Sequence, residues 1–522
     1  YVDTRSGRFR LPDGRTADFH GACITESSAL QDVNGLVNIT DEKLEWFSGH
    51  GLNTLRLGVH WSLYETEPQV FNQSYLEDIA QLVSRLGRYN IWAIIDMHQD
   101  QWSGYYCSGH GIPEFYAAPP TTKPYDVGGK RAYPLPIAEP TWTSRVQPPS
   151  VEMNCSSFLR DHHGSAASLY TYALGAASQR LYDEPDLQAA FGLFWSRVAM
   201  ALRSLPNVLA FELINEPWYG DVRLERGNKG VDGWQLGQPA ALSAPSLMRL
   251  HHALHIAIRA VDDETLLLFE PGAGGAAYFE PTNYSSGPGG SMYDTKQCFS
   301  YHQYCPKSLD GNEWGDATTF SPSVEAAIIS ECNKGTKDMV SLRTTDSSVA
   351  GSGGAAIVTE FGQVNNNSVG LAALSVATDT FERYGQGWTI WSVQLMNWLQ
   401  TNGVPGYSKL PEAPPENWLR PFARTYAAVI AGEILEQTFD TQSGFYELAF
   451  SADPDLSVRY LNSTIKCSPS VHYKGGIRSS ISPIEAGTVL DVSDRFGDLI
   501  FRPNDSLQPN ERVTIKVWRV KD

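Results

Sequence analysis

Short apolar runs alternate, over the first three-quarters of the chain, with segments that have the spacing of amphipathic helices. The runs are bounded by turn-forming residues, a pattern typical of strands that are buried on both faces. Eight such strands alternating with helices predict an α/β fold, the (β/α)8 barrel. The predicted strands are 18–25, 52–59, 90–97, 207–214, 265–270, 298–302, 355–361 and 387–393, and the predicted helices are 41–49, 75–88, 186–204, 245–261, 369–384 and 417–431.

The pattern changes after Gly432 to short segments in which apolar and polar residues alternate. Such segments, with turn residues between them, predict a small antiparallel β-sandwich. We therefore expect two domains, a barrel over residues 1–432 and a β-sandwich over residues 433–522. The segments that predict the sandwich are "FYELAFSA" (445–452), "LSVRYLN" (456–462), "TVLDVS" (488–493), "DLIFRP" (498–503) and "RVTIKVWRV" (512–520).

A long insertion, about 99–185, follows the third predicted strand and exceeds an ordinary connection in a barrel. It is rich in Pro, Gly, Tyr and His, with Cys107 and Cys155 near its two ends. We expect it to form an ordered loop over the active face. A disulfide between these two cysteines would hold that loop in place.

Polar residues gather where the predicted strands end, which is where barrel enzymes carry their catalytic groups. Taken singly, each has a simpler explanation: His98 as a core histidine, Arg56 as part of a salt bridge at the rim, or Trp391 as core. Their recurrence at six strand ends favours one shared site, with two carboxylates flanking a bond and donors orienting one of them. The residues are Arg56, His98, Asp100, Asn215, Glu216, His302, Tyr304, Glu360 and Trp391.

Hydrolysis of a glycosidic bond requires two carboxyls in different environments, one protonated and one ionised. Glu216 follows Asn215 and is expected near His302, which could keep it neutral. Glu360 is expected near Arg56 and a tyrosine hydroxyl, which would favour the ionised form. Glu216 is therefore the candidate acid and Glu360 the candidate nucleophile.

Composition excludes several classes of partner. The formal net charge of −18 argues against binding to nucleic acid or to an anionic membrane surface, because both require a basic surface. No apolar run approaches the roughly 18 residues of a membrane-spanning helix, so we expect a soluble chain. The cysteines include no C-x-x-C pair, and Cys298 and Cys305 lack the further ligands of a zinc site. We expect no metal and no other cofactor.

Cysteines and glycosylation sequons together favour an oxidising compartment, so we expect a secreted or lumenal protein. The chain begins at Tyr1 without a methionine, which suggests a mature form whose signal peptide is not shown. The odd number of cysteines leaves at least one thiol free or paired with another molecule, and we expect Cys23 to be a buried free thiol. The sequons lie at Asn38, Asn72, Asn154, Asn283, Asn366, Asn462 and Asn504.

The motifs "NTLRLG", "LINEP", "YHQY", "VTEFG" and "WTIWSV" resemble those of glycoside hydrolase family 5. This resemblance implies that Glu216 is the acid/base and Glu360 the nucleophile of a retaining β-glycosidase. It also implies that Asn215 touches the sugar 2-hydroxyl. In the same pattern Arg56, His302 and Tyr304 support the two acids.

The stretch "IIDMHQDQWSGYYCSGHGIPEF" is similar to the endoglycoceramidase and glycosylceramidase branch of that family. In that branch His98 and Asp100 would hydrogen-bond the sugar beside the cleaved bond. The implied substrate is a glycosphingolipid, presented in a membrane or a micelle, whose glycan is cleaved from ceramide. The long loops 108–185 and 394–416 depart from the family pattern and leave the choice of glycan open.

A lipid substrate needs an apolar surface, and two predicted loops could supply one. The same side chains could instead pack against one another as loop core. Two other substrates also remain open, a steryl glucoside and a polysaccharide, as does a binding protein that has lost activity. The candidate groove residues are Phe115, Tyr116, Leu395, Met396, Trp398 and Leu399.

Overall fold

The structure is a computed structural model of the 522-residue chain. It describes residues 1–25, 39–106, 109–117, 126–127, 130–131, 172–218, 220, 239–272, 281–305, 322–349, 354–362, 364, 367–391, 413–492 and 496–520.

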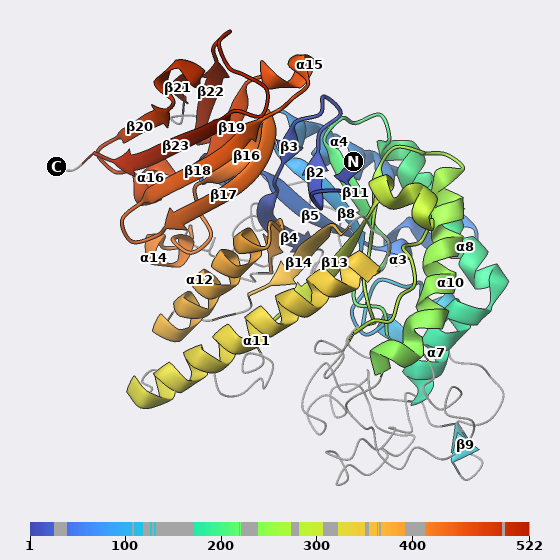
Figure 1. Cartoon of the computed structure of the whole chain (residues 1–522). Coiled ribbons are helices and arrows are strands. Elements are labelled where there is room, and N and C mark those ends of the chain that lie inside the picture. The colour runs from blue at the N-terminus through green and yellow to red at the C-terminus, as the bar shows by residue number, and fades with distance from the viewer. Residues whose placement is uncertain are drawn as a thin grey trace.

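Eight parallel strands close into a barrel at the centre of the molecule (Figure 1). They follow one another around the barrel in chain order, and the last, β15, pairs with the first, β4. Every predicted strand is confirmed, within a few residues at the ends. The strands are β4 (His20–Thr25), β5 (Thr54–Val59), β8 (Trp92–Met97), β11 (Val208–Glu212), β12 (Leu266–Phe269), β13 (Gln297–Gln303), β14 (Ala356–Phe361) and β15 (Trp388–Ile390).

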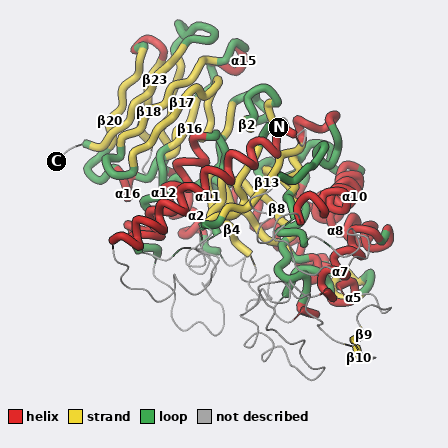
Figure 2. Tube along the Cα trace, turned by 60° about the horizontal axis from the view of Figure 1, so that its bottom comes forward, coloured by secondary structure: helices red, strands yellow, loops and turns green. Residues whose placement is uncertain are grey.

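Helices pack around the outside of the barrel, and five of them lie where the hydrophobic pattern predicts. These are α2 (Asp41–Gly49), α4 (Gln73–Gly87), α8 (Pro185–Leu202), α10 (Pro239–Arg259) and α12 (Ser368–Arg383). Two further helices were not predicted, α7 (Tyr172–Asp183) and α11 (Pro322–Val349). The long helix α11 runs beside α12, as Figures 1 and 2 both show.

The helix predicted at 417–431 is wrong. Only a single turn, α14 (Glu416–Leu419), is helical, and the chain then enters the strand β16 (Tyr426–Ile430). β16 pairs on one side with β3 (Thr16–Ala17) and on the other with β19 (Ser463–Lys466). This long-range pairing overrides the local helical pattern of the Ala-rich segment.

Two antiparallel sheets form the C-terminal part of the molecule, with strand orders β1-β2-β3-β16-β19-β22-β21 and β17-β18-β23-β20. Apolar side chains of both sheets share one core, which is the expected sandwich. The first sheet includes three strands from the N-terminus of the chain. The segment 456–462 was predicted as a strand but begins as a helical turn, α15 (Leu456–Arg459). The remaining strands are β1 (Val2–Asp3), β2 (Arg8–Arg10), β17 (Gly432–Asp440), β18 (Phe445–Ala452), β20 (Ile477–Ser482), β21 (Gly487–Val492), β22 (Asp498–Pro503) and β23 (Arg512–Arg519).

Shorter elements complete the described chain. They are α3 (Trp61–Tyr64), β6 (Glu65–Glu67), β7 (Val70–Phe71), η1 (Gly104–Tyr106), α5 (Glu114–Ala117), β9 (Asp126–Val127), β10 (Lys130–Arg131), η4 (Ser291–Lys296), α16 (Pro469–His472) and η6 (Ile484–Ala486). None of the helices in the described ranges is long and apolar enough to cross a bilayer.

One disulfide joins described residues, and sequence analysis did not predict it: Cys305, just after β13, is bonded to Cys332 of α11. Cys23 is a buried free thiol, as expected. The disulfide predicted between Cys107 and Cys155 lies outside the described residues.

Candidate active site

The strand-end residues singled out by the sequence lie together at the carboxyl end of the barrel. Arg56 comes from β5, His302 from β13 and Glu360 from β14. Asn215 and Glu216 lie in the segment just after β11. Parallel strands bring these positions to one rim because their carboxyl ends all point the same way.

Glu360 is buried and accepts hydrogen bonds on both carboxylate oxygens. Nη1 of Arg56 donates to Oε1 at 2.6 Å, and the hydroxyl of Tyr304 donates to Oε2 at 2.6 Å. Nδ1 of His302 lies 3.4 Å from Oε2. Burial raises the pKa of Glu360 above its ordinary value, while the cationic His302 and Arg56 act in the opposite direction. The carboxylate is therefore fixed in orientation by two donors.

Arg56 is held by acids that sequence analysis missed. Its Nε donates to Glu212 at 2.5 Å, and its Nη2 lies 3.0 Å from Asp96 and donates to the amide oxygen of Asn215 at 2.7 Å. A buried arginine requires such partners, because an unpaired buried charge is costly. Glu212 and Asp96 interrupt apolar strands, and that interruption is the signal that could have identified them.

Glu216 is the more open of the two acids: 28% of its side chain is exposed, against 5% for Glu360. Nδ1 of His302 lies 2.8 Å from its Oε1. Its backbone has φ of +40°, in the left-handed region. Two other side chains hold that backbone: the Gln99 amide donates to the carbonyl of Glu216 at 2.9 Å, and the carboxylate of Glu270 accepts from its N–H at 3.2 Å.

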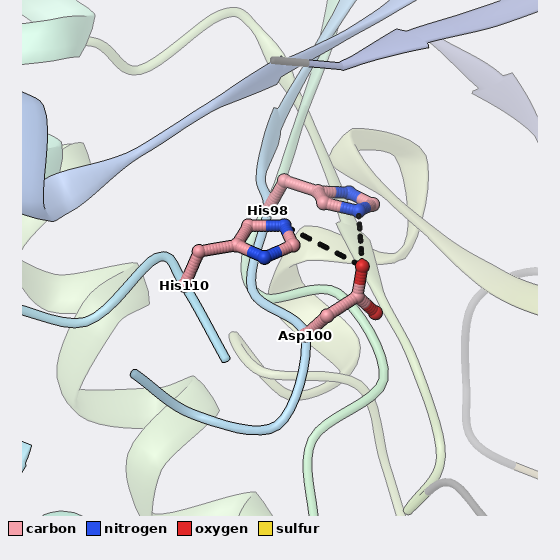
Figure 3. Close-up of side chains that lie close together, drawn as sticks. All are labelled: His98, Asp100 and His110. Atoms are coloured by element: carbon pink, nitrogen blue, oxygen red, sulfur yellow. Dashed lines mark ion pairs between the residues drawn. The ribbon is translucent and has the colours of Figure 1, made fainter. Parts of the chain in front are cut away.

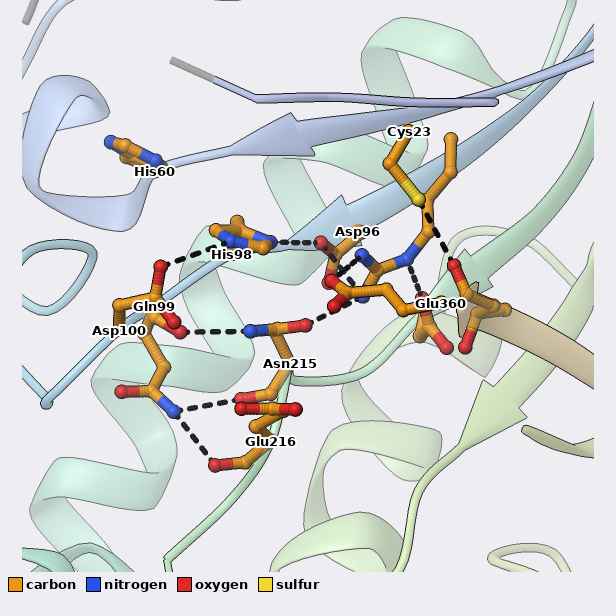
Figure 4. Close-up of polar contacts among 12 residues, drawn as sticks. Cys23, His60, Asp96, His98, Gln99, Asp100, Asn215, Glu216 and Glu360 are labelled. Carbon is orange, nitrogen blue, oxygen red and sulfur yellow. Dashed lines mark hydrogen bonds and ion pairs between the residues drawn. The ribbon is translucent and has the colours of Figure 1, made fainter. Parts of the chain in front are cut away.

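At the side of the site His98 lies between Asp96 and Asp100 (Figure 4), and Asp100 lies between His98 and His110 (Figure 3). Nδ1 of His98 is 2.7 Å from Asp96, and its Nε2 is 3.5 Å from Asp100, which also faces His110 at 3.4 Å. Burial disfavours the imidazolium form of His98, but Asp96 and Asp100 outweigh it and raise the pKa to about 10. The indole of Trp391 stacks on His98 with the ring centroids 5.4 Å apart.

The two acids are close enough to act on one anomeric carbon. A carboxylate oxygen of Glu216, one of Glu360 and a nitrogen of His302 all lie within 4.8 Å of one another. Retaining glycosidases place their carboxyls roughly 5 to 5.5 Å apart, and inverting ones roughly 6.5 to 9.5 Å, to leave room for a water molecule. The spacing suits direct attack by one acid on the sugar.

Within the described part of the chain, two groups of side chains have ligand atoms near enough to share a cation. One is Glu216, His302 and Glu360, and the other is His98, Asp100 and His110. In both, the carboxylates already pair with histidine nitrogens. That the protein needs no metal or other cofactor stays a prediction.

The candidate lipid groove is described only in part. The side chain of Phe115 is 37% exposed. Tyr116 is half-buried, with its ring 5.0 Å from Trp61 and its hydroxyl donating to Glu65 at 3.0 Å, so it is loop core. The other predicted groove residues, Leu395, Met396, Trp398 and Leu399, lie outside the described residues.

Comparison with known families matches both parts of this fold. The model for cellulase of glycosyl hydrolase family 5 matches residues 156–397, and the model for the family 5 C-terminal domain matches residues 424–517. The chain belongs to glycoside hydrolase family 5. The family resemblance of the sequence motifs is thereby confirmed, and this family 5 member is a glycoside hydrolase.

Relatives of this family 5 chain include the endoglycoceramidase of Cyanea nozakii, 24% identical over 512 residues that cover 97% of this chain and 90% of the relative. Endo-glycoceramidase II from Rhodococcus sp., solved as a lactosyl-enzyme intermediate, is 19% identical with a TM-score of 0.68, covering 98% of this chain and 100% of that one. Sterylglucosidase 1 of Cryptococcus neoformans is 14% identical with a TM-score of 0.65, covering 98% and 97%. At these identities, the two solved structures show that this chain has the same fold as they do.

Proposed function

We propose that this protein is a retaining β-glycosidase that hydrolyses the bond between the glycan and the ceramide of a glycosphingolipid. The observation that carries the mechanism is the acid pair, with carboxylate oxygens of Glu216 and Glu360 within 4.8 Å of each other. Glu360 attacks the anomeric carbon and forms a glycosyl ester. Glu216 gives its proton to the ceramide oxygen as the glycosidic bond breaks.

The second half of the reaction releases the glycan. Glu216, now a carboxylate, takes a proton from water, whose oxygen attacks the anomeric carbon. The ester bond breaks and Glu360 leaves as a carboxylate, beside Arg56 and Tyr304, which donate to it. The greater exposure of Glu216 suits its role, because both the leaving oxygen and the water must reach it.

The sugar would lie on the polar side chains around the acids. His98 and Asp100 would hydrogen-bond the sugar beside the cleaved bond, and Asn215 its 2-hydroxyl. Trp391 offers an apolar face next to His98. Because Asn215 is held by Arg56 and by the carbonyl of Gln99, its amide is oriented before the sugar binds.

The glycosphingolipid substrate is supported by the near-full-length similarity to an endoglycoceramidase. Ceramide carries two chains that leave water on binding, and each buried methylene contributes about 0.8 kcal/mol. The exposed Phe115, in the loop after β8, is a described residue that could contact those chains. The substrate would be met in a membrane or a micelle.

A steryl glucoside is the second candidate substrate, because a sterylglucosidase shares the fold over nearly the whole chain. Thin-layer chromatography of digests of a ganglioside, glucosylceramide, galactosylceramide and a steryl glucoside separates these assignments. Release of an intact oligosaccharide and ceramide from the ganglioside is the expected result. Cleavage of the steryl glucoside alone would replace the ceramide assignment. Failure to cleave these lipids or an aryl β-lactoside would favour an inactive binding protein.

The acid roles are tested by labelling. A 2-fluoro sugar inactivator should form an ester with Glu360, located by mass spectrometry of a peptide digest. Glu360→Ala should lose nearly all turnover and still bind substrate, because the pocket keeps its other contacts. A label on a different acid would remove the assignment.

We also propose a secreted or lumenal location. The Cys305–Cys332 disulfide supports an oxidising compartment. The sequon residues Asn283, Asn462 and Asn504 are exposed, where a glycan could be attached. Digestion of the natively expressed protein with an N-glycanase should lower its apparent mass, and an unchanged mass would count against this location.

A further inference from the structure

Glu270 is a buried acid that takes no part in the reaction proposed above. It follows directly after β12 and is 3% exposed. Burying a carboxyl costs free energy unless its oxygens find partners, so its contacts indicate what it does.

The first contact is with the backbone of the candidate acid. Oε2 of Glu270 accepts a hydrogen bond from the N–H of Glu216 at 3.2 Å. Glu216 has φ of +40°, which non-glycine residues adopt only where their surroundings hold them. The amide of Gln99 donates to the carbonyl of Glu216 at 2.9 Å. Gln99, which follows β8, thus holds the carbonyl of Glu216, and Glu270, which follows β12, holds its N–H.

The second contact runs through a histidine. Oε1 of Glu270 lies 3.4 Å from Nε2 of His302, whose Nδ1 lies 2.8 Å from Oε1 of Glu216. Nε2 therefore faces the carboxyl of Glu270, and Nδ1 faces those of Glu216 and, at 3.4 Å, Glu360. A partner on one nitrogen of an imidazole fixes the ring and its tautomer, and so decides what the other nitrogen offers. Glu270 reaches Glu216 by two routes, its backbone and the ring beside its side chain.

We propose that Glu270 is a positioning residue for the acid/base Glu216, holding the Glu216 backbone and the His302 ring so that the Glu216 carboxyl points at the departing oxygen. The inference rests on the proposed function, in which Glu216 protonates that oxygen.

The surroundings suit a carboxyl with this role. Burial raises the pKa of Glu270 to about 8. At neutral pH it is therefore mostly protonated, and a third carboxyl can lie beside the two acids without a full negative charge. When Glu270 is ionised, Nη2 of Arg56, 3.5 Å from its Oε1, compensates the negative charge.

The test compares substrates that differ in their need for a proton. An alkyl β-lactoside has a poor leaving group and requires the acid. The dinitrophenolate of 2,4-dinitrophenyl β-lactoside is a good leaving group and departs without protonation. Because kcat/KM reports only the steps up to bond cleavage, it isolates the acid role of Glu216 from its later role as base. Glu270→Ala should lower kcat/KM for the alkyl lactoside about 100-fold, as for a misplaced catalytic group, and for the dinitrophenyl lactoside by less than about fivefold.

Conservative and matched variants distinguish positioning from a general loss of structure. Glu270→Gln should retain more activity on the alkyl lactoside than Glu270→Ala, because its amide oxygen can still accept from the Glu216 N–H. Glu382→Gln alters another buried acid, bonded to Arg424 away from the site. Glu382→Gln should lower thermal stability and leave unchanged the ratio of kcat/KM for the two lactosides. Equal losses on both substrates in Glu270→Ala would overturn the proposal.

A crystal structure of Glu270→Ala tests the inference without relying on turnover. The backbone of Glu216 should leave the left-handed region or the His302 ring should rotate. An unchanged peptide and ring would overturn the positioning role even in an active enzyme. If the wild-type protein cleaves neither lactoside, the proposed function fails, and a displaced Glu216 in the variant still supports the structural link.

Discussion

The two acids of the site differ most in how their oxygens are held. Both oxygens of Glu360 accept from fixed donors, Arg56 and Tyr304, whereas one oxygen of Glu216 faces a histidine and the side chain is partly open. A nucleophile gains from fixed orientation, because misplacement by about 1 Å can cost about a hundredfold in rate. An acid/base must reach two different partners in turn and gains from access.

Tyr304→Phe tests how Glu360 is held in its ionised form. In the proposed mechanism the carboxylate form of Glu360 attacks, so activity should be present above the pKa of Glu360 and be lost as pH falls through it. Burial already raises that pKa, and removing a hydrogen bond to the charged form raises it further. A bond to a charged group contributes about 1.5 to 3 kcal/mol, so the acid limb of kcat/KM should move to higher pH by about one to two units.

Tyr301→Phe is the matched control for this shift. The hydroxyl of Tyr301 is buried and donates to Gln386 at 2.6 Å, away from Glu360. Profiles of kcat/KM against pH on an aryl β-lactoside, from pH 4 to 9, should show the shift in Tyr304→Phe alone. If the acid limb of the kcat/KM profile lies at the same pH in both variants as in the wild type, its position is not determined by the ionisation of Glu360.

Sequence analysis found most residues of the site from their places at strand ends, and missed Glu270 and Gln99, which also follow strands, because their role depends on side-chain direction. Parallel strands align their carboxyl ends, so the pattern of strands alone places Asn215 and Glu360 at one rim. Nothing in the local pattern says that Glu270 turns toward the Glu216 backbone, or that Gln99 meets it from the other side. These contacts depend on the closure of the barrel and on rotamers.

At the scale of whole elements, the strands were predictable and some helices were not. Buried parallel strands read as continuous apolar runs, which few other elements imitate. α11 has few apolar residues at helical spacing and contains Gly335, so its pattern is weak. β16 was mistaken for a helix because its partners, β3 and β19, lie far away in sequence.

The disulfide between Cys305 and Cys332 joins the end of β13 to α11 and closes a loop with a sequence separation of 27. Cross-linking such a loop restricts the unfolded chain and is expected to stabilise the protein by about 3 to 4 kcal/mol. Cys332→Ser should lower the free energy of unfolding by that amount, measured with urea. Since Cys305 follows Tyr304, the variant should also lose activity as the temperature rises.

Cys298→Ser is the control for the disulfide, because Cys298 is a buried free thiol in β13, the strand that Cys305 follows. A reductant should destabilise the wild type and Cys298→Ser by about 3 to 4 kcal/mol more than Cys332→Ser, in which only the predicted Cys107–Cys155 pair is left to reduce. A wild type that is insensitive to reductant under denaturing conditions would contradict the cross-link. Peptide mapping without reduction would, in the same experiment, test the predicted Cys107–Cys155 pair.

Phe115 tests whether the loop after β8 contacts lipid. Phe115 lies in α5 with its side chain 37% exposed. Its ring makes an edge-on contact with the ring of Tyr116. Phe115→Ser should raise KM for a ceramide-linked substrate about fourfold to fifteenfold, since losing one or two methylene equivalents of burial costs about 0.8 to 1.6 kcal/mol. An aryl lactoside should be unaffected, because it has no chains to bind.

Met292→Ser is the matched control for Phe115. Met292 is 91% exposed, in η4, which leads into the opposite, amino-terminal end of β13. It should change KM for neither substrate. Parallel losses on both substrates in Phe115→Ser would make Phe115 a structural residue, and the glycolipid assignment would then rest on similarity to relatives.

At the scale of the whole molecule, the N-terminal strands β1 to β3 join a sheet whose other strands follow the barrel in the chain. β3 precedes the first barrel strand by only a few residues, yet it pairs with β16, which follows the last barrel helix. The sandwich therefore contains strands from both sides of the barrel in sequence. This topology predicts that barrel and sandwich unfold together, because the barrel is tied at both ends of its chain to neighbouring strands of the same sandwich sheet, β3 and β16.

Arg424, at the junction of the two parts, tests this coupling. It is 1% exposed, donates to Glu382 of the barrel helix α12 at 2.5 Å, and lies 5.4 Å from the ring centroid of Phe439 in β17. Arg424→Leu leaves Glu382 buried without its partner and should lower the free energy of unfolding by about 3 to 5 kcal/mol. Arg420→Leu is the control: Arg420 pairs with Glu416, both more than a third exposed, and its loss should cost less than about 1 kcal/mol.

Urea unfolding followed by tryptophan fluorescence and by circular dichroism should give coincident transitions in the wild type and both variants, with only that of Arg424→Leu displaced strongly. A variant in which the two probes separate, one part unfolding while the other stays folded, would show that the shared sheet does not couple them.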